Sequence, residues 1–438
     1  MITTLRRLGH DLRTAANVLL NGLRARRARD LARRRADATP PPQHGSVRVL
    51  LYFADTRVNL YQVRQWYAPL RRLAERHGVA ILARSPGGYL ALSDEAPVPV
   101  VYLRTIAEIE TFLADQDVAL MLYVNQNVKN FQMLRYGRLV HVFINHGESD
   151  KAYMTSNQFK AYDYAFVAGQ AALDRLGREL WDYEVERRAI LVGRPQTDHL
   201  LDAGIPVPVG DRILVFYAPT WEGDRPTMAY GSLVSHGRDL ARAVLASPAH
   251  RLVFRPHPRT GVNDPEHAAA RAEIAALIET ANRADPTAGH LFDEGPDLGW
   301  QFTAADVQIT DVSAMIYDRL ATGKPLIVTR PAAAEAELDE SGYLGAAEWL
   351  RAADAPEVLA AIDHVRHDPA ARDVLARWST HHFGDTSPGA STERFHEAVD
   401  RLVGLRDERL RATPPGEAET RPYAPDEEDD DPHVPPRE

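Results

Sequence analysis

Two histidines in this sequence occupy positions from which a side chain can take part in proton transfer. His146 follows the apolar run 139–145 in the segment VFINHGESDK, and His257 lies between two prolines in FRPHPRTG. An imidazole titrates near neutral pH, so it can take a proton from a hydroxyl or donate one to a leaving group. We predict His146 and His257 as the catalytic residues, with satisfied surface or turn histidines as the alternative.

Basic side chains close to both histidines suit an anionic ligand. Lys151 follows His146 at a short distance, and Arg255 and Arg259 flank His257. Charged donors of this kind form strong hydrogen bonds with phosphate oxygens. We therefore predict that these three cations bind an anionic ligand, and the alternative is a turn with scattered surface charge.

A further segment, ITDVSAMIYDRLATGKPLIV, has the pattern of a phosphate-binding helix start. Its strand-like part ends at Thr310, and a helix is predicted over 312–322. A helix N-terminus offers unpaired N–H groups and the positive end of the dipole, which suits a diphosphate, although the polar residues there can also act only as helix caps. From this segment and from FYAPTWEG, in which we expect Trp221 to cover the core, the predicted residues of the phosphate-binding site are Thr220, Thr310, Asp311, Ser313, Asp318 and Lys324.

The elements that must position these residues alternate between strand and helix. Such alternation predicts parallel β–α units, and polar residues just past the strands of such a sheet face the ligand crevice. We expect an α/β, GT-B-like fold with two Rossmann-like domains facing across a cleft. The expected strands are 47–54, 78–83, 98–103, 118–124, 139–145, 212–217, 250–255, 306–310 and 325–328; the expected helices include 61–77, 237–247, 264–283, 312–322 and 354–365.

Composition divides the 438 residues into four segments. Residues 1–46 are predicted as a basic amphipathic helix and linker, 47–205 and 206–410 as the two domains, with a hinge at 201–211, and 411–438 as a disordered acidic tail. The first 39 residues carry ten Arg and three Asp, which favours either an arm on an anionic membrane surface or a solvated arm. Nucleic acid is not an expected partner, because no aromatic platform accompanies the arginines.

Further features of the composition indicate which compartment and which cofactors to expect. The chain has no cysteine, which suits a reducing cytoplasm, and no apolar run long enough to span a membrane. We expect a cytoplasmic protein, peripheral on the inner face of the plasma membrane. The predicted folded part holds no DxD-type motif, so no protein-bound metal is expected, while Mg²⁺ can still accompany a nucleotide.

Taken in order, the motifs resemble those of the CDP-glycerol glycerophosphotransferases of teichoic acid assembly. The resemblance covers roughly 140–395 and rests on HG with the later Lys151, YAPTW, HP, TDVS with Asp318, and KP. GRPQTDHL and the closing HHFGDTSPGASTER resemble two further family segments. Two departures stand out: Gly384 precedes Asp385 where the family usually has Asp-Gly, and Glu222 replaces a frequent basic residue.

The resemblance implies a reaction. An acceptor hydroxyl would attack the distal phosphorus of a CDP-linked polyol, and CMP would leave. His146 would act as the general base, and His257 would stabilise or protonate the departing phosphate. The first domain would hold a lipid-linked saccharide or polymer acceptor, and the second would hold CDP-glycerol or a similar donor. The alternatives are a GT-B glycosyltransferase that uses a nucleotide sugar and a non-catalytic, membrane-associated assembly protein.

Overall fold

The computed structural model describes residues 22, 24–147, 156–202, 204–208, 210–295 and 298–413, and they form two α/β lobes. The first lobe is built on a seven-stranded parallel sheet with the order β3-β2-β1-β4-β5-β6-β7. Its strands are β1 (Val49–Phe53), β2 (Val79–Ala83), β3 (Val100–Tyr102), β4 (Leu120–Tyr123), β5 (Val140–Phe143), β6 (Tyr164–Val167) and β7 (Ala189–Leu191).

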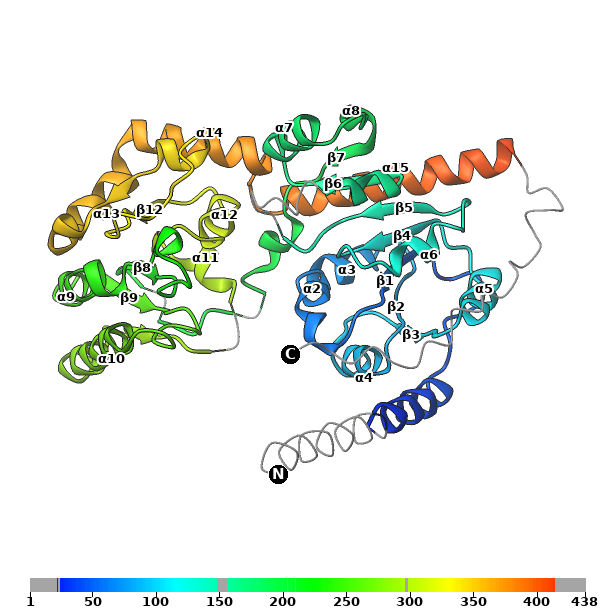
Figure 1. Cartoon of the computed structure of the whole chain (residues 1–438), viewed down its shortest axis with the longest axis horizontal. Coiled ribbons are helices and arrows are strands. Elements are labelled where there is room, and N and C mark those ends of the chain that lie inside the picture. The colour runs from blue at the N-terminus through cyan, green and yellow to red at the C-terminus, as the bar shows by residue number, and fades with distance from the viewer. Residues whose placement is uncertain are drawn as a thin grey trace, which may run out of the picture.

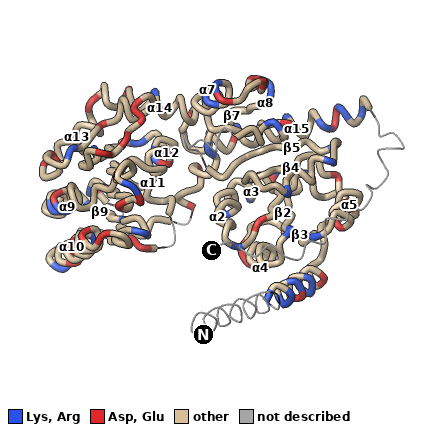
Figure 2. The backbone as a smooth tube through the Cα atoms, viewed as in Figure 1, with Lys and Arg blue, Asp and Glu red and all other residues tan. Residues whose placement is uncertain are grey.

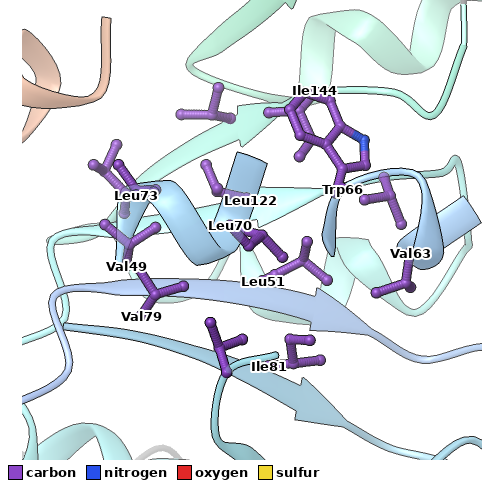
Figure 3. Packing of buried hydrophobic residues seen from close by; sticks show 14 of the residues in the cluster. Val49, Leu51, Val63, Trp66, Leu70, Leu73, Val79, Ile81, Leu122 and Ile144 are labelled. Carbon is purple, nitrogen blue, oxygen red and sulfur yellow. The ribbon is translucent and has the colours of Figure 1, made fainter. Parts of the chain in front are cut away.

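Apolar strands and amphipathic helices explain why this sheet is buried on both faces. Successive side chains of a strand point to opposite faces, so Val49 and Leu51 lie in one core cluster while Leu50 and Tyr52 lie in the other. Figure 3 shows the first cluster, with Trp66 and the helix that follows it packed on β1 and β2. The helices of this lobe are α2 (Leu60–Arg64), α3 (Tyr67–Leu73), α4 (Pro86–Glu95), α5 (Ile106–Asp115), α6 (Asn130–Met133), α7 (Gln170–Glu179) and α8 (Val185–Arg188).

The second lobe repeats this plan with a six-stranded parallel sheet of order β10-β9-β8-β11-β12-β13. Its strands are β8 (Ile213–Ala218), β9 (His250–Phe254), β10 (Leu291–Phe292), β11 (Val307–Thr310), β12 (Leu326–Thr329) and β13 (Trp349–Leu350). One face is covered by α9 (Arg238–Leu245), α10 (Pro265–Ala284) and α13 (Val358–His367). The other face is covered by α11 (Trp300–Ala304), α12 (Met315–Leu320) and α14 (Pro369–Phe383).

Local sequence signals fix where the longer helices begin and end. The side chain of Asp264 accepts a hydrogen bond from Glu266 N–H at the start of α10, and that of Asp368 accepts one from Ala371 N–H at the start of α14. In both helices proline occupies the first position, where no N–H is needed. Helix α14 ends at Gly384, whose φ of 67° favours glycine.

The chain returns to the first lobe at its end. Helix α15 (Ala390–Ala412) runs along the first lobe in Figure 1, and its residues Phe395, Val399 and Leu402 are buried in the core cluster of β1, β2 and β4. The predicted boundary at residue 410 assigned this helix to the second domain. The structure differs because the apolar face of α15 completes the first core.

Most predicted elements agree with the structure to within a few residues, with some differences. The predicted helix 61–77 is broken into α2 and α3, and strands β6, β7, β10 and β13 were not predicted. Of the predicted arm, residues 24–38 are helical, and residues 1–21 and the tail from 414 lie outside the described residues. No described helix combines the length and apolar composition needed to cross a bilayer.

Candidate functional site

Both sheets have their topological switch point between two central strands, and several of the predicted site residues follow strands at or next to that point. In the first sheet β1 and β4 are neighbours whose connections run in opposite directions, and in the second sheet β8 and β11 have the same relationship. Open α/β sheets bind ligands at the carboxyl ends of the strands beside such a point. His146 follows β5, next to β4, and His257 follows β9, next to β8.

The backbone around His146 is held in an unusual conformation. Asn145 has a φ of 53°, and its side chain accepts a hydrogen bond from His146 N–H at 2.8 Å and donates one to the carbonyl of Gly147. The indole N–H of Trp66 donates to the carbonyl of Asn145 at 2.6 Å. Asn tolerates positive φ better than most residues. The turn therefore presents the imidazole in a fixed direction beside the ring of Tyr61, which packs edge-on at 5.7 Å.

The hydrogen bonds of His146 leave Nε2 as a proton acceptor. Nδ1 lies 3.0 Å from the carbonyl oxygen of Val124, so Nδ1 carries the proton and donates it there. Burial lowers the pKa of His146, and the charge of Arg194 lowers it further, while the Val124 carbonyl opposes both. At neutral pH the ring is thus uncharged with a lone pair on Nε2, as a general base requires.

His257 has the opposite arrangement. Its Nδ1 accepts a hydrogen bond from the backbone N–H of Arg259 at 3.1 Å, so the neutral ring carries its proton on Nε2. Burial lowers the pKa of His257, the charge of Arg259 acts in the same direction, and Glu222 opposes them. The backbone N–H of His257 donates to the carbonyl of Pro219, which ties this loop to the end of β8. His257 can therefore donate a proton or hydrogen bond from Nε2.

Trp221 has a role that its sequence position did not indicate. The guanidinium of Arg259 lies 3.7 Å from the centre of the indole, and the imidazole of His257 stacks on the same indole at 6.3 Å. We expected Trp221 to cover the core, but it is only half buried. A cation over a tryptophan face is attracted by the ring quadrupole. Trp221 thus positions two of the predicted site residues.

Glu222, one of the two departures from the family pattern, holds the His257 loop in place. Its carboxylate accepts backbone N–H bonds from Gly261 at 3.0 Å, Asn263 at 2.8 Å and Asp264 at 3.1 Å. Burial raises the pKa of Glu222, but these bonds more than offset that effect, so its pKa lies below the ordinary value. The acidic residue thus fits a local demand for a carboxylate acceptor.

Asp311 is buried beneath the site rather than exposed in it. One carboxylate oxygen accepts the backbone N–H bonds of Thr220 at 2.7 Å and Ser232 at 3.0 Å, and the other accepts the hydroxyl of Thr329 at 2.5 Å. Burial raises the pKa of Asp311 to about 6. Asp311 therefore orients the loop after β8 from below.

The other predicted donor-binding residues lie in different parts of the structure. Arg255 is at the carboxyl edge, where its guanidinium donates to Asp293 at 2.8 Å, and Ser313 is half exposed before α12. Thr310 is buried and donates to the carbonyl of Ala218. Lys324 precedes β12 at the opposite edge of the sheet and contacts the carbonyl of Thr303, so the structure does not bring it to His257. Lys151 lies outside the described residues.

A pocket of about 600 Å³ lies between the lobes. Arg194, which follows β7, forms an ion pair across it with Asp318 of α12. This pair accounts for the position of Asp318 and places a cation near His146. The pocket is lined by Tyr61, Arg64, Gln65, Tyr67, Ala68, Arg194, Gln196, Thr197, His199, Leu200, Leu298, Gly299, Trp300, Phe302 and Asp318.

Comparison with solved structures supports the two-lobed, GT-B-like fold. The wall teichoic acid polymerase TagF is similar with a TM-score of 0.52 and 14% identity over 91% of this chain and 97% of that chain. A UDP-N-acetylglucosamine 2-epimerase is similar with a TM-score of 0.50 and 14% identity over 87% and 98%. At such identities the likeness shows the fold alone. A comparison with curated protein sequences found no match.

The family follows from the sequence itself. The model of the CDP-Glycerol:Poly(glycerophosphate) glycerophosphotransferase family matches residues 119–344, which is more than half of the chain. The matched range includes His146, His257, Asp311 and Asp318. It thus contains residues from the carboxyl edges of both sheets. The chain therefore belongs to the CDP-glycerol glycerophosphotransferase family of enzymes.

Proposed function

We propose that this enzyme transfers glycerol phosphate, or a related polyol phosphate, from a CDP-linked donor to a hydroxyl of a lipid-linked acceptor of the cell envelope, releasing CMP. The observation that carries the proposal is the opposite protonation of two histidines at the carboxyl edges of the two sheets. His146 has a lone pair on Nε2 and His257 has a proton there. A transfer between phosphate and hydroxyl needs one group of each kind.

In the proposed reaction, Nε2 of His146 takes the proton of the acceptor hydroxyl. The acceptor oxygen forms a bond to the distal phosphorus of the donor, and the bond from that phosphorus to the bridging oxygen breaks. The electron pair stays on the bridging oxygen, which leaves as part of CMP. His257 donates from Nε2 to the phosphate on which charge develops, and such charge stabilisation usually supplies a large share of catalysis.

The surrounding side chains would bind and neutralise the donor. Arg259, stacked on Trp221, supplies positive charge next to His257. The half-exposed Ser313 follows β11, and the Thr220 loop, which Asp311 fixes from below, follows the neighbouring strand β8. These residues are our candidates for holding the diphosphate. Lys151 stays a prediction, as does Mg²⁺ accompanying the nucleotide.

The test is a donor screen in the presence of membrane extract. It measures the release of CMP from CDP-linked donors and of UMP or UDP from UDP-sugars. CDP-glycerol, CDP-ribitol and UDP-sugars are compared at equal concentrations, with the double variant His146→Ala, His257→Ala as the blank. Faster turnover of a CDP-polyol supports the proposal and identifies the polyol. Faster turnover of a UDP-sugar would replace it with the glycosyltransferase alternative.

We propose further that the basic arm places the enzyme on the cytoplasmic face of the plasma membrane. Figure 2 shows the basic residues gathered on the helix 24–38. Arg33 and Arg35 are used to dock this helix, through Glu108 and Asp94 of the first lobe, and Ala32 of the same helix is buried in the first core cluster. The exposed cations that remain are Arg24, Arg26, Arg27 and Arg34.

Each basic residue near an anionic surface contributes roughly 1 kcal/mol, so this set suffices for a measurable effect. Changing the four exposed arginines to Gln, with Arg33 and Arg35 kept, is expected to reduce pelleting with vesicles that contain anionic phosphatidylglycerol. Turnover of a water-soluble acceptor should not change. Unchanged pelleting would rule out these four arginines as the membrane contact.

A further inference from the structure

A second pocket, of about 470 Å³, opens at the switch point of the first sheet beside His146. Its volume lies within the range of roughly 300–1,000 Å³ found for small-ligand sites. Asp55 follows β1, Asn125 follows β4 and His146 follows β5, so three neighbouring strands deliver their ends to it. The pocket is lined by Asp55, Tyr61, Gln62, Asn125, Gln126, Asn127, Phe143, Asn145, His146 and Phe159.

Among the described residues, the lining of this pocket is rich in amides and poor in positive charge. Five of its ten described lining residues are Asn or Gln, and Asp55 is the one Asp, Glu, Lys or Arg among these ten. An amide side chain both donates and accepts hydrogen bonds, as a sugar hydroxyl does. Sites that recognise phosphate instead gather Arg or Lys, and a carboxylate next to a phosphate is repulsive.

The polar groups of the pocket orient one another before any ligand binds. The amide nitrogen of Asn125 donates to Gln62 at 2.7 Å and lies 3.4 Å from the Asp55 carboxylate. Asp55 also accepts from the Asn59 side chain at 2.7 Å, and Gln62 donates to the hydroxyl of Tyr61 at 3.2 Å. Preorganised groups lose less entropy when a ligand binds.

Tyr61 connects this pocket to the reaction site. Its ring packs against His146, and it lines both this pocket and the pocket between the lobes. A ligand in the pocket therefore lies next to the imidazole that would take its proton.

We infer that this pocket binds the acceptor, and that the acceptor unit it takes is an uncharged saccharide rather than the phosphate-bearing end of a polyol-phosphate chain. That the bound saccharide is the acceptor rests on the proposed function, but the binding preference of the pocket stands by itself. Asp55 and the amides would hold sugar hydroxyls, and Asp55 would repel an anionic terminus.

The test measures equilibrium binding to the full-length chain by calorimetry, without donor. The probes are a panel of neutral disaccharide methyl glycosides and a dimer of glycerol phosphate. At least one glycoside is expected to bind more tightly than the dimer. Asp55→Asn should weaken its binding about tenfold or more, since a bond to a charged group is lost, and Gln126→Ala about threefold.

One control and a second pocket variant make the result decisive. Asp115→Asn makes the same change at an exposed carboxylate outside the pocket, at the end of α5, and should leave binding unchanged. The Gln126 side chain makes no hydrogen bond to another described residue, so Gln126→Ala tests the pocket even if Asp55→Asn fails to fold.

The outcomes separate this inference from the proposed function. Tighter binding of the glycerol phosphate dimer, no binding of any glycoside, or unchanged glycoside binding in both pocket variants would overturn the inference. CDP-glycerol titrated into the same samples reports on the donor site separately. If CDP-glycerol does not bind, the proposed function fails, while the glycoside results still decide what the pocket holds.

Discussion

Asp198 and Thr392, which are far apart in the sequence, are joined by two hydrogen bonds to one carboxylate oxygen. The backbone N–H of Thr392 donates at 2.7 Å and its hydroxyl at 2.8 Å. Asp198 belongs to GRPQTDHL at the end of the first sheet, and Thr392 belongs to the closing motif at the start of α15. The two motifs therefore form a joint where the chain returns to the first lobe.

Gly193→Ala should weaken this joint. Gly193 has a φ of 74°, and an added Cβ would collide with the side chains of Arg394 and Ser391. The left-handed conformation alone costs a non-glycine residue about 1–2 kcal/mol. We expect a lower midpoint in urea denaturation. As a control, Gly404→Ala lies in α15 with open space around its Cβ and should raise stability by about 0.5–1 kcal/mol. Equal midpoints for Gly193→Ala and the unaltered chain would contradict the role of the joint.

Sequence periodicity predicted the parallel sheets, and strand-end position predicted where His146 and His257 lie in them, while the catalytic role of both histidines stays a prediction. These sequence signals did not predict the short edge strands β7, β10 and β13, because two or three residues carry too little pattern. Nor did they predict α15 in the first core or the stack of Trp221, His257 and Arg259, because both depend on tertiary contacts. Asp311 was assigned to ligand binding on sequence grounds, although burial makes it a support for Thr220.

His146 and His257 should each be essential for turnover. For His146 the structure suggests a variant that removes the base and keeps the hydrogen bond to Val124. His146→Asn retains a side-chain N–H that can donate to the Val124 carbonyl but has no base at the Nε2 position. With CDP-glycerol as the donor, this variant and His257→Ala are each expected to lower kcat at least ~100-fold. Their thermal melting temperatures should be unchanged. His367→Asn, at an exposed position of α13, serves as the matched control. Turnover within threefold of the unaltered enzyme would remove that histidine from the mechanism.

The rate should fall on the acid side because His146 must be neutral to act. Burial and Arg194 lower its pKa below the ordinary value of 6.5, so the group is active above that lowered pKa and loses activity as pH decreases through it. Protonating His257 does not remove its Nε2 proton, so the acid limb is assigned to His146. Arg194→Gln removes the cation and should shift the acid limb of kcat to higher pH. A limb that stays in place or moves lower would contradict this assignment.

Glu222→Gln should loosen the loop that carries His257. The carboxylate accepts three backbone N–H bonds, and an amide would direct its own N–H toward at least one of these donors. We expect faster hydrogen–deuterium exchange over residues 259–264 and a lower kcat, with little change in global melting. Glu279→Gln, at an exposed position of α10, controls for the loss of charge. Unchanged exchange in the loop would show that Glu222 does not hold it.

Asp311 offers a test in which stability and pH are linked. Its pKa of about 6 in the folded protein exceeds the ordinary value of 3.8, so the folded state binds the proton more tightly than the unfolded chain. The stabilisation from this group is present below pH 3.8 and is lost as pH rises through 6. A shift of about two pKa units corresponds to roughly 3 kcal/mol. Asp311→Asn keeps an oxygen for the N–H groups of Thr220 and Ser232 and does not titrate.

The free energy of unfolding, measured in urea, should therefore increase for Asp311→Asn relative to the unaltered protein as pH rises from 4 to 7. Asp311→Ala should be less stable than Asp311→Asn at every pH. It leaves the N–H groups of Thr220 and Ser232 without their acceptor, at about 1–3 kcal/mol for each unsatisfied buried group. Equal stability of the Ala and Asn variants, or a difference between Asn and Asp that is independent of pH, would show that the carboxylate is not the buried support of the Thr220 loop.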